Sequence, residues 1–485
     1  MGGTREGAIA RATRHFDDGG FRALLDGLVA IPSTSQDDAF APECRRYLAD
    51  AIAPWAERLG FGCAIHDNPV PGFGPILTAR RDEGAGLPTV LLYGHGDTVR
   101  GLDAQWSEGL APWRVTERDG RWYGRGTADN KGQHAICLAA LEAALAERGG
   151  RLGANVVLLI ETSEERGSRG LREFVAANRA RLAADVLIAS DGPRVAPGVP
   201  AIATGTRGSF HFDLSLRLRP GGVHSGHWGG LVTDPAIRLA HALGTITDAR
   251  GRILVDAWLP PGRRLPDSVR AALAGCPAEG GEAVTEGWGE PGLTPAEKIF
   301  GWTSFIVLAM VSGQPENPVN AVAPDARAHC QIRYTVDADP AGFMPALRAH
   351  LDAAGFEDIV IGRPGIRMAA SRTDPAHPWV GWAKASMERS LGLRVQVVPN
   401  AGGGLPGDVF VDHLGVPLVW VPHSYTGCLQ HGPDEHLLPA LARQGIAAFA
   451  GLWWDRGGGG PPRGGARGGR RGGAGRRRGG AWARG

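Results

Sequence analysis

The sequence lacks three features that would place it outside the cytoplasm. No stretch approaches about 18 uninterrupted apolar residues, so no segment is expected to span a membrane. The opening Met-Gly-Gly-Thr-Arg-Glu is not followed by the apolar run of a secretory signal. No two cysteines have the close spacing of a zinc knuckle or a redox motif. They are Cys44, Cys63, Cys137, Cys276, Cys330 and Cys428. We therefore expect reduced thiols in a cytoplasmic protein.

Net charge is also small, and it is unevenly distributed along the chain. The chain carries a formal charge of +2, yet residues 456–485 hold nine arginines and no acidic residue. Without that segment the charge of the remaining chain falls to −7. A mildly acidic body argues against a nucleic-acid-binding core.

The end of the chain, residues 456–485, has a composition that cannot form a hydrophobic core. It consists almost entirely of Gly, Arg, Pro and Ala, which predicts a disordered tail. Arginine-glycine segments can bind RNA through charge, so an RNA-associated role acting through the tail is one hypothesis. The whole chain has 49 arginines against three lysines, however, and this general bias favours an extension without such a role.

The rest of the chain has enough apolar residues for a packed interior, at 43% hydrophobic, and its length predicts two or three domains. Four short apolar runs are typical of strands buried on both faces. They span residues 89–93, 155–160, 186–189 and 416–421. Residues 133–148 have helical spacing. The pattern predicts an α/β catalytic domain whose central, mostly parallel sheet is flanked by helices.

The pattern changes after about residue 206, which indicates an inserted second domain. Residues 209–218 and 326–336 alternate apolar and polar, as half-exposed strands do, and two helical segments accompany them. We expect a smaller α+β domain at 206–370, inserted into a catalytic domain made of 1–205 and 371–455.

Residues able to bind a metal follow the apolar runs or lie in a glycine-rich loop. Taken singly, each has an ordinary structural explanation, such as a helix cap, a turn or a solvated surface pair. Taken together they form an inventory of two histidines and three carboxylates, with a further glutamate adjacent. The five candidate ligands are His95, Asp129, Glu165, Asp191 and His431, and the adjacent acid is Glu164.

These motifs, in this order, resemble the co-catalytic metallopeptidases that include carboxypeptidase G, aminoacylase, succinyl-diaminopimelate desuccinylase and the carnosinase-type dipeptidases. The resemblance covers residues 20–455. Its motifs are 94–97 (Gly-His-Gly-Asp), 124–132, 164–168, Asp191 and His431. Segments 223–230 and 402–406 are similar to the carnosinase-type branch, although Gly404 stands where that branch has a serine.

The resemblance implies a role for each residue. Asp129 would bridge two divalent ions, with His95 and Asp191 completing one site and Glu165 and His431 the other. Zn²⁺ is the expected ion, with Mn²⁺ and Co²⁺ as alternatives. It further implies that Glu164 is the general base, that Asp97 orients His95 by a hydrogen bond, and that the peptide bond after Asp129 is strained, often cis.

On the substrate side, the resemblance implies that the insert acts as a lid and dimerisation domain. His224 would be supplied by the partner subunit of a homodimer and would donate to the carbonyl oxygen. The substrate would be bound by Arg333, Asn320 and the amides of Gly403 and Gly404. Arg333 would bind the carboxylate of the substrate. The alternatives are a turn histidine at 224 and an outward-facing strand arginine at 333.

The predicted function is a dinuclear metal-dependent hydrolase of amide bonds in small substrates with a free carboxylate, foremost a dipeptidase. An N-acyl-amino-acid deacylase or carbamoylase needs the same metals and base, and the sequence offers no clear acidic residue for a substrate ammonium that would separate the two. A metal-free binding protein on the same scaffold is the non-enzymatic alternative, which the complete set of ligands and base argues against.

Overall fold

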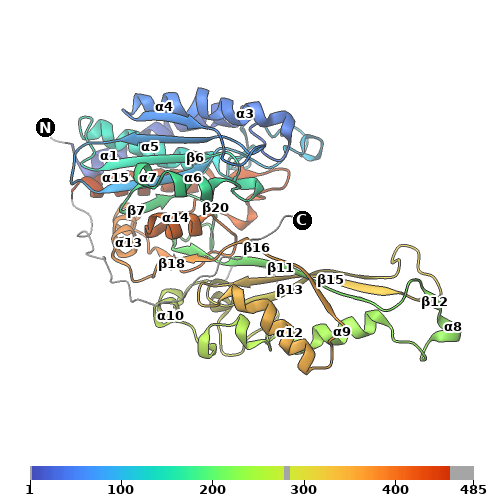
Figure 1. Cartoon of the computed structure of the whole chain (residues 1–485). Helices are drawn as coiled ribbons and strands as arrows, with labels where there is room; N and C mark the ends of the chain where they lie inside the picture. Colours follow the sequence, from blue (N-terminus) through green and yellow to red (C-terminus); the bar gives the residue numbers. More distant parts are fainter. Residues whose placement is uncertain (1–2, 278–283, 459–485) are drawn as a thin grey trace.

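The computed structural model describes residues 3–277 and 284–458, and Figure 1 shows two stacked parts. Helix α15 (Pro439–Gly457) continues beyond residue 455, and its Arg456 is buried with the guanidinium 5.2 Å from the ring centre of Trp379. The predicted start of the tail at 456 is therefore too early. Residues 459–485 of that tail lie outside the described residues. No helix of the described part is long and apolar enough to cross a membrane.

The upper part in Figure 1 is built on an eight-stranded sheet. Its central neighbours are parallel, β6 with β3, β3 with β7 and β7 with β19, and antiparallel strands flank them. The predicted mostly parallel sheet is thus confirmed. In spatial order the strands are β1 (Gly62–His66), β2 (Ile76–Arg81), β6 (Asn155–Glu161), β3 (Thr89–His95), β7 (Val186–Ala189), β19 (Leu418–Trp420), β9 (Ala201–Ala203) and β18 (Gln396–Val398).

Helices cover both faces of this sheet, which explains the unbroken apolar runs. In β3, Val90 and Leu92 belong to the core on one face, while Leu91 and Tyr93 belong to the core on the other. Successive side chains of a strand point to opposite faces, so a strand covered twice must be apolar throughout. The first face is covered by α1 (Arg5–Asp17), α2 (Gly20–Val29), α4 (Ala53–Arg58), α5 (Lys131–Glu147), α13 (Pro378–Leu391) and α15, and the second by α6 (Leu171–Ala177) and α14 (Gly407–Leu414).

The lower part is a four-stranded antiparallel sheet with α9 (Pro235–Ile246) and α12 (Phe343–Ala353) on one face. Its order is β13 (Ser304–Ser312), β15 (Asp325–Tyr334), β11 (Gly208–Arg217) and β16 (Val360–Met368). Along β11 every second residue, such as Phe212, is buried among the helices. The alternation found in the sequence follows from this single covered face. The stretch 252–300 contributes two short helices, α10 (Asp267–Leu273) and α11 (Pro295–Phe300).

The chain crosses between the two parts at two adjacent segments. Strand β10 (Gly205–Thr206) pairs with β17 (Ser371–Arg372), so the outgoing and returning chains lie side by side. A Cβ at residue 205 would lie 1.9 Å from the carbonyl oxygen of Ser371, and only glycine permits this approach. The predicted insert, 206–370, has its two ends in or next to these paired segments, and its status as a separate domain stays a prediction.

Two features of the lower part have no counterpart in the sequence analysis. Strand β13 forms one edge of the sheet, and most of its apolar side chains are exposed. Strands β12 (Val223–His224) and β14 (Ala321–Val322) form a small antiparallel pair, which lies with helix α8 (Ser225–Trp228) at the end far from the large sheet (Figure 1).

The core of the lower part yields a stability prediction. Phe212 is fully buried and packs edge-on to Trp258, with ring centres 6.0 Å apart. We expect Phe212→Ala to lower the free energy of unfolding by about 3–5 kcal/mol, because the cavity it leaves cannot collapse completely. Urea unfolding followed by circular dichroism measures this. The control Ile237→Ala, on the exposed side of α9, should change it by less than about 0.5 kcal/mol, and equal effects would contradict the packing argument.

Candidate metal centre

Three neighbouring parallel strands deliver side chains to the same edge of the large sheet. His95 is the last residue of β3. Glu165 lies in the short turn η4 (Glu164–Arg166) that follows β6, and Asp191 comes two residues after β7. Because β6, β3 and β7 are parallel neighbours, their carboxyl ends meet, and ligand sites of open α/β sheets lie there.

Asp129, immediately before α5, lies at the middle of the cluster. Its Oδ1 is 3.0 Å from His95 Nε2, while its Oδ2 is 3.2 Å from His431 Nε2. His431 Nε2 is also 3.2 Å from Glu165 Oε2, and His95 Nε2 is 3.8 Å from Asp191 Oδ2. Each oxygen of Asp129 therefore faces a different histidine, and each of these histidines lies near a further carboxylate. All five residues singled out in the sequence come together here.

The carboxylates are buried close to one another, which changes their acidity. Burial raises the pKa of Glu165 to about 7, and the charge of Asp129 adds to the rise. Burial likewise raises the pKa of Asp191 to about 7. The pKa of His431 reaches about 11, because hydrogen bonds to Asp129 and Glu165 favour its cationic form. The imidazoles of His95 and His431 therefore lie against the buried carboxylates, whose negative charge favours a cation at these positions.

Two carboxylate oxygens show what the cluster can hold. Within the described residues, Glu165 Oε1 and Asp191 Oδ2 are buried and accept no hydrogen bond. Ligand atoms of His95, Asp129 and Glu165 all lie within 4.8 Å of one another. Buried anionic oxygens without donors are strongly unfavourable unless a cation compensates them, and imidazole with carboxylate is a donor set suited to zinc, manganese or cobalt. The residues present therefore fit divalent metal ions.

Glu164 and Asp97 lie against the ligands. Glu164 lines the same cavity, and burial raises its pKa well above the usual value, with the charges of Glu165 and Asp191 adding to the rise. Asp97 Oδ1 is 3.3 Å from His95 Nδ1. The Asp97 carboxylate also accepts the backbone N–H groups of Glu164 at 3.2 Å and Glu165 at 3.1 Å. One buried acid thus links a ligand histidine to the turn that carries two glutamates.

The sequence analysis missed Glu435, which holds the Asp129 loop. Its carboxylate accepts the backbone N–H groups of Ala128 at 2.9 Å and Asp129 at 3.0 Å, and it pairs with buried Arg125 at 2.8 Å. The only signal in the sequence is its position four residues after His431. The peptide bond between Asp129 and Asn130 is cis, as the resemblance implies.

A cavity of about 570 Å³ opens over the cluster and is shared by the two parts of the molecule. Arg333, Gly403 and Gly404 line it, as predicted, and Ser209, Met368 and Gln430 line it without having been predicted. A Cβ at residue 404 would lie 2.0 Å from the sulfur of Met368. The serine of the resembling branch would therefore require Met368 to move.

His224 and Asn320 are not brought to this cavity. Both lie at the β12–β14 pair, far from the large sheet (Figure 1), where the backbone N–H of Ser225 donates to the carbonyl oxygen of Asn320 at 3.0 Å. His224 is exposed, and its ring stacks on that of His227 with centres 4.5 Å apart. Within one chain, the described residues that line the cavity include neither of them.

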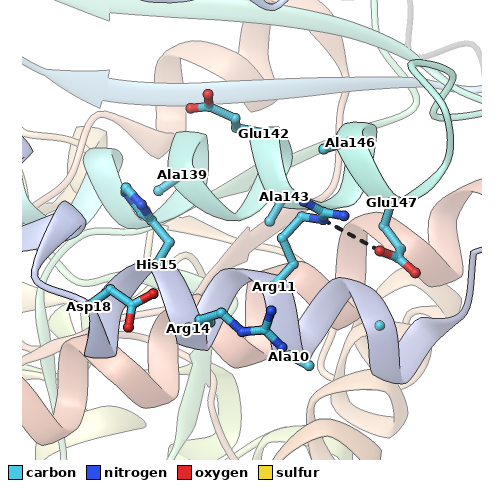
Figure 2. A pocket seen from close by; sticks show the side chains of 11 residues that line it. Ala10, Arg11, Arg14, His15, Asp18, Ala139, Glu142, Ala143, Ala146 and Glu147 are labelled. Atoms are coloured by element: carbon cyan, nitrogen blue, oxygen red, sulfur yellow. Dashed lines mark hydrogen bonds and ion pairs between the residues drawn. The ribbon is translucent and has the colours of Figure 1, made fainter.

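A second cavity, of about 520 Å³, lies between α1 and α5 in the upper part of the molecule (Figure 2). Alanines of both helices form much of its lining, and Arg11 Nε donates to Glu147 Oε2 at 3.4 Å at one end. It contains none of the residues that the sequence singles out. The first cavity is therefore the candidate active site.

Comparison with known proteins agrees with the motifs. Peptidase family M20/M25/M40 matches residues 91–455. A cysteinylglycine-S-conjugate dipeptidase of Corynebacterium striatum is 30% identical over 323 residues, or 66% of this chain and 70% of that protein. A Beta-Ala-His dipeptidase of Homo sapiens is 35% identical over 250 residues, but only 48% of each chain is covered.

Solved structures show the same fold. Human carnosine dipeptidase 1 superposes with a TM-score of 0.71 at 23% identity, over 94% of this chain and 99% of that chain. An M20 family metallo-carboxypeptidase from Sulfolobus solfataricus gives 0.72 at 24% identity, over 90% and 99%. The resemblance inferred from the motifs is confirmed, and the chain belongs to peptidase family M20/M25/M40 and is a metallopeptidase.

Proposed function

We propose that this metallopeptidase hydrolyses dipeptides and similar small substrates that end in a free carboxylate, using two divalent ions. The observation that carries the proposal is the position of Asp129, whose two oxygens face two different candidate ligands, His95 and His431. The relatives named as dipeptidases support the substrate class. His95 and Asp191 would hold one ion, His431 and Glu165 the other, and Asp129 both. The ions, Zn²⁺ foremost, would supply Lewis-acid activation of the carbonyl and the attacking water.

Glu164 is the proposed general base. It lines the cavity next to the ligand Glu165, and its raised pKa suits a group that must take up and release a proton near neutral pH. In this role its carboxylate accepts a proton from the attacking water and then donates it to the leaving amine. Asp97 keeps the Glu164 turn in place through its contact with the Glu164 backbone N–H.

Arg333 is the proposed partner of the substrate carboxylate. It reaches the cavity from β15, opposite the metal ligands, and burial lowers its pKa without removing its charge at neutral pH. A planar guanidinium can bind a carboxylate through two parallel hydrogen bonds. The backbone amides of Gly403 and Gly404 line the same cavity and would add donors.

We infer a homodimer in which His224 acts on the partner's cavity. Exposed apolar side chains along the edge strand β13, including Leu308 and Met310, favour pairing with a second copy, since such an edge is otherwise prone to aggregation. His224 Nδ1 accepts the N–H of Gly226 at 3.2 Å, so a neutral ring carries its proton on Nε2 and presents a donor. Asn320 lies near His224 and would reach the partner's cavity together with it.

An N-acyl-amino-acid deacylase or carbamoylase is the alternative within the family, because it needs the same ligands and base. Rates on a panel of dipeptides against matched N-acetyl and N-carbamoyl amino acids separate the two. We place the enzyme in the cytoplasm, since its six cysteines are all free thiols. RNA retention before and after removal of residues 456–485 tests the separate role of the tail.

The first prediction concerns metal content. After dialysis, elemental analysis should find two ions per wild-type chain and fewer than one in Asp129→Ala, since that residue is proposed to bind both. The control Glu147→Gln removes a carboxylate from the second cavity and should keep two ions. A wild type that holds one ion or none would contradict the dinuclear site.

The second prediction concerns the base. Glu164→Gln is nearly isosteric and leaves Glu165 in place, so it should keep its metal ions and lose about 10²–10⁴-fold in kcat, since the amide cannot accept the proton. Steady-state kinetics and metal analysis on the same sample measure both. Glu173→Gln, an exposed change on α6, should retain wild-type activity. Retention of more than half the activity in Glu164→Gln would show that another group is the base.

The third prediction concerns His224. His224→Ala and Glu164→Gln are each expected to be inactive, yet mixing them under conditions that exchange subunits should restore activity. In a mixed dimer, one cavity has an intact Glu164 and receives an intact His224 from the partner, which allows about half the wild-type activity. Mixing Glu164→Gln with Asp129→Ala should restore none, because no cavity is then complete. Failure of the first mixture, with exchange demonstrated, would rule out action in trans.

A further inference from the structure

A row of polar side chains leads away from the cavity along the face of the small sheet that α9 and α12 leave open. Neighbouring strands β11 and β15 supply it, and alternate residues of a strand share one face. The row begins at the cavity wall, where Ser209 and Arg333 stand. Its cross-strand pairs are Ser209 with Arg333, His211 with Gln331, and Asp213 with His329.

Four hydrogen bonds connect this row from end to end. Arg333 Nε donates to Gln331 Oε1 at 3.3 Å, and Gln331 Nε2 is 2.8 Å from His211 Nε2. His211 Nδ1 is 3.4 Å from His329 Nε2. His329 Nδ1 is 2.5 Å from Asp213 Oδ1.

The two ends fix the direction of every bond in the row. Arginine can only donate, so the Gln331 atom that faces it must be the oxygen, and the amide nitrogen must face His211. His211 Nε2 then accepts, which leaves its proton on Nδ1 to be donated to His329 Nε2. His329 in turn donates from Nδ1 to a carboxylate that can only accept. With neutral imidazoles, only this arrangement satisfies all four bonds.

Further contacts hold both ends of the row. At the outer end, Arg363 Nε donates to Asp213 Oδ2 at 2.8 Å. Burial alone would raise the pKa of Asp213, but its bonds with His329 and Arg363 lower that pKa, so Asp213 is an anion. At the inner end, Ser209 Oγ lies 3.1 Å from Gln331 Nε2 and 2.9 Å from His211 Nε2. A second contact thus holds the same amide nitrogen.

We propose that Gln331 is a positioning residue that aims the Arg333 guanidinium into the cavity, and that His211 and His329 fix the direction of the Gln331 amide. The inference rests on the proposed role of Arg333 toward the substrate carboxylate. Among the described residues, Gln331 is the one whose side chain forms a hydrogen bond with the Arg333 guanidinium. The bond uses only Nε of Arg333. Both Nη groups are left for a bidentate ligand. Fixing a long, flexible side chain before binding lowers the ordering cost of binding.

The test compares a dipeptide with its C-terminal amide, which has the same scissile bond and no terminal carboxylate. Arg333→Gln establishes the reference and should weaken kcat/KM for the dipeptide by at least 10-fold more than for the amide. Gln331→Met keeps the length of the side chain and removes its polar atoms. With the bond to Ser209 counted, the substitution removes three hydrogen bonds of this side chain. It should raise KM for the dipeptide about 2–10-fold, with kcat and the kinetics of the amide unchanged. His211→Leu should produce a smaller effect of the same kind.

The control is Arg327→Gln, which removes an exposed cation from the same strand six residues earlier and should alter neither substrate. If Arg333→Gln weakens both substrates equally, the role of Arg333 in the proposed function is wrong and the inference falls with it. If Arg333→Gln discriminates but Gln331→Met changes nothing, or changes both substrates equally, the positioning role alone is wrong.

A second measurement needs no variant of Gln331 and no substrate. Two-bond ¹H–¹⁵N spectra of the histidine-labelled wild type, assigned with His211→Leu and His329→Leu, report which ring nitrogen carries the proton. For the bond directions given above, we expect the ring proton of His211 on Nδ1, where it faces His329 Nε2. A proton on Nε2 of His211 would turn the Gln331 amide around, place its nitrogen against Arg333, and overturn the proposal.

Discussion

Several carboxylates buried together at one edge of a sheet are the constraint on which the rest of this structure depends. Asp129, Glu164, Glu165 and Asp191 share a space that two imidazoles neutralise only in part, and two of their oxygens accept no hydrogen bond from the described residues. Buried charge of one sign is tolerated where cations compensate it. The same arrangement that is costly for the folded chain makes the edge a strong binding site for divalent ions.

Keeping such groups in place requires fixed donors around them, and the backbone supplies many. Asp97 ties the turn after β6 to His95, and Glu435 ties the loop before α5 through N–H groups of that loop. Both are acids that coordinate nothing in the proposed site. They set the positions of neighbouring ligands, which is how supporting residues tune a metal centre. The ligands therefore come from separate loops, yet each loop is held by a buried carboxylate.

The sequence predicts the metal centre better than the substrate side for a physical reason. A strand covered on both faces has an unmistakable apolar run, and the residue after it must lie at the sheet edge, so the positions of His95, Glu165 and Asp191 could be inferred. Glu435 lies in a loop whose path only the fold defines. Strand β13 is apolar although it is an exposed edge, a situation that a pattern rule for buried strands does not cover. The distant position of His224 follows from the pairing of β12 with β14, a strand about a hundred residues later, which the sequence gives no signal of.

The two sheets contribute to the cavity in different ways. Helices cover the large sheet on both faces, so it can present chemistry only at its strand ends, where the metal ligands lie. Helices cover the small sheet on one face, so its open face can carry a continuous polar row up to Arg333. A change of residue on that open face alters what the cavity recognises and leaves the ligand cluster untouched. This separation is consistent with ligand motifs that do not fix the substrate: a dipeptide and an N-acyl amino acid share the carboxylate proposed for Arg333, and they differ at the amine end.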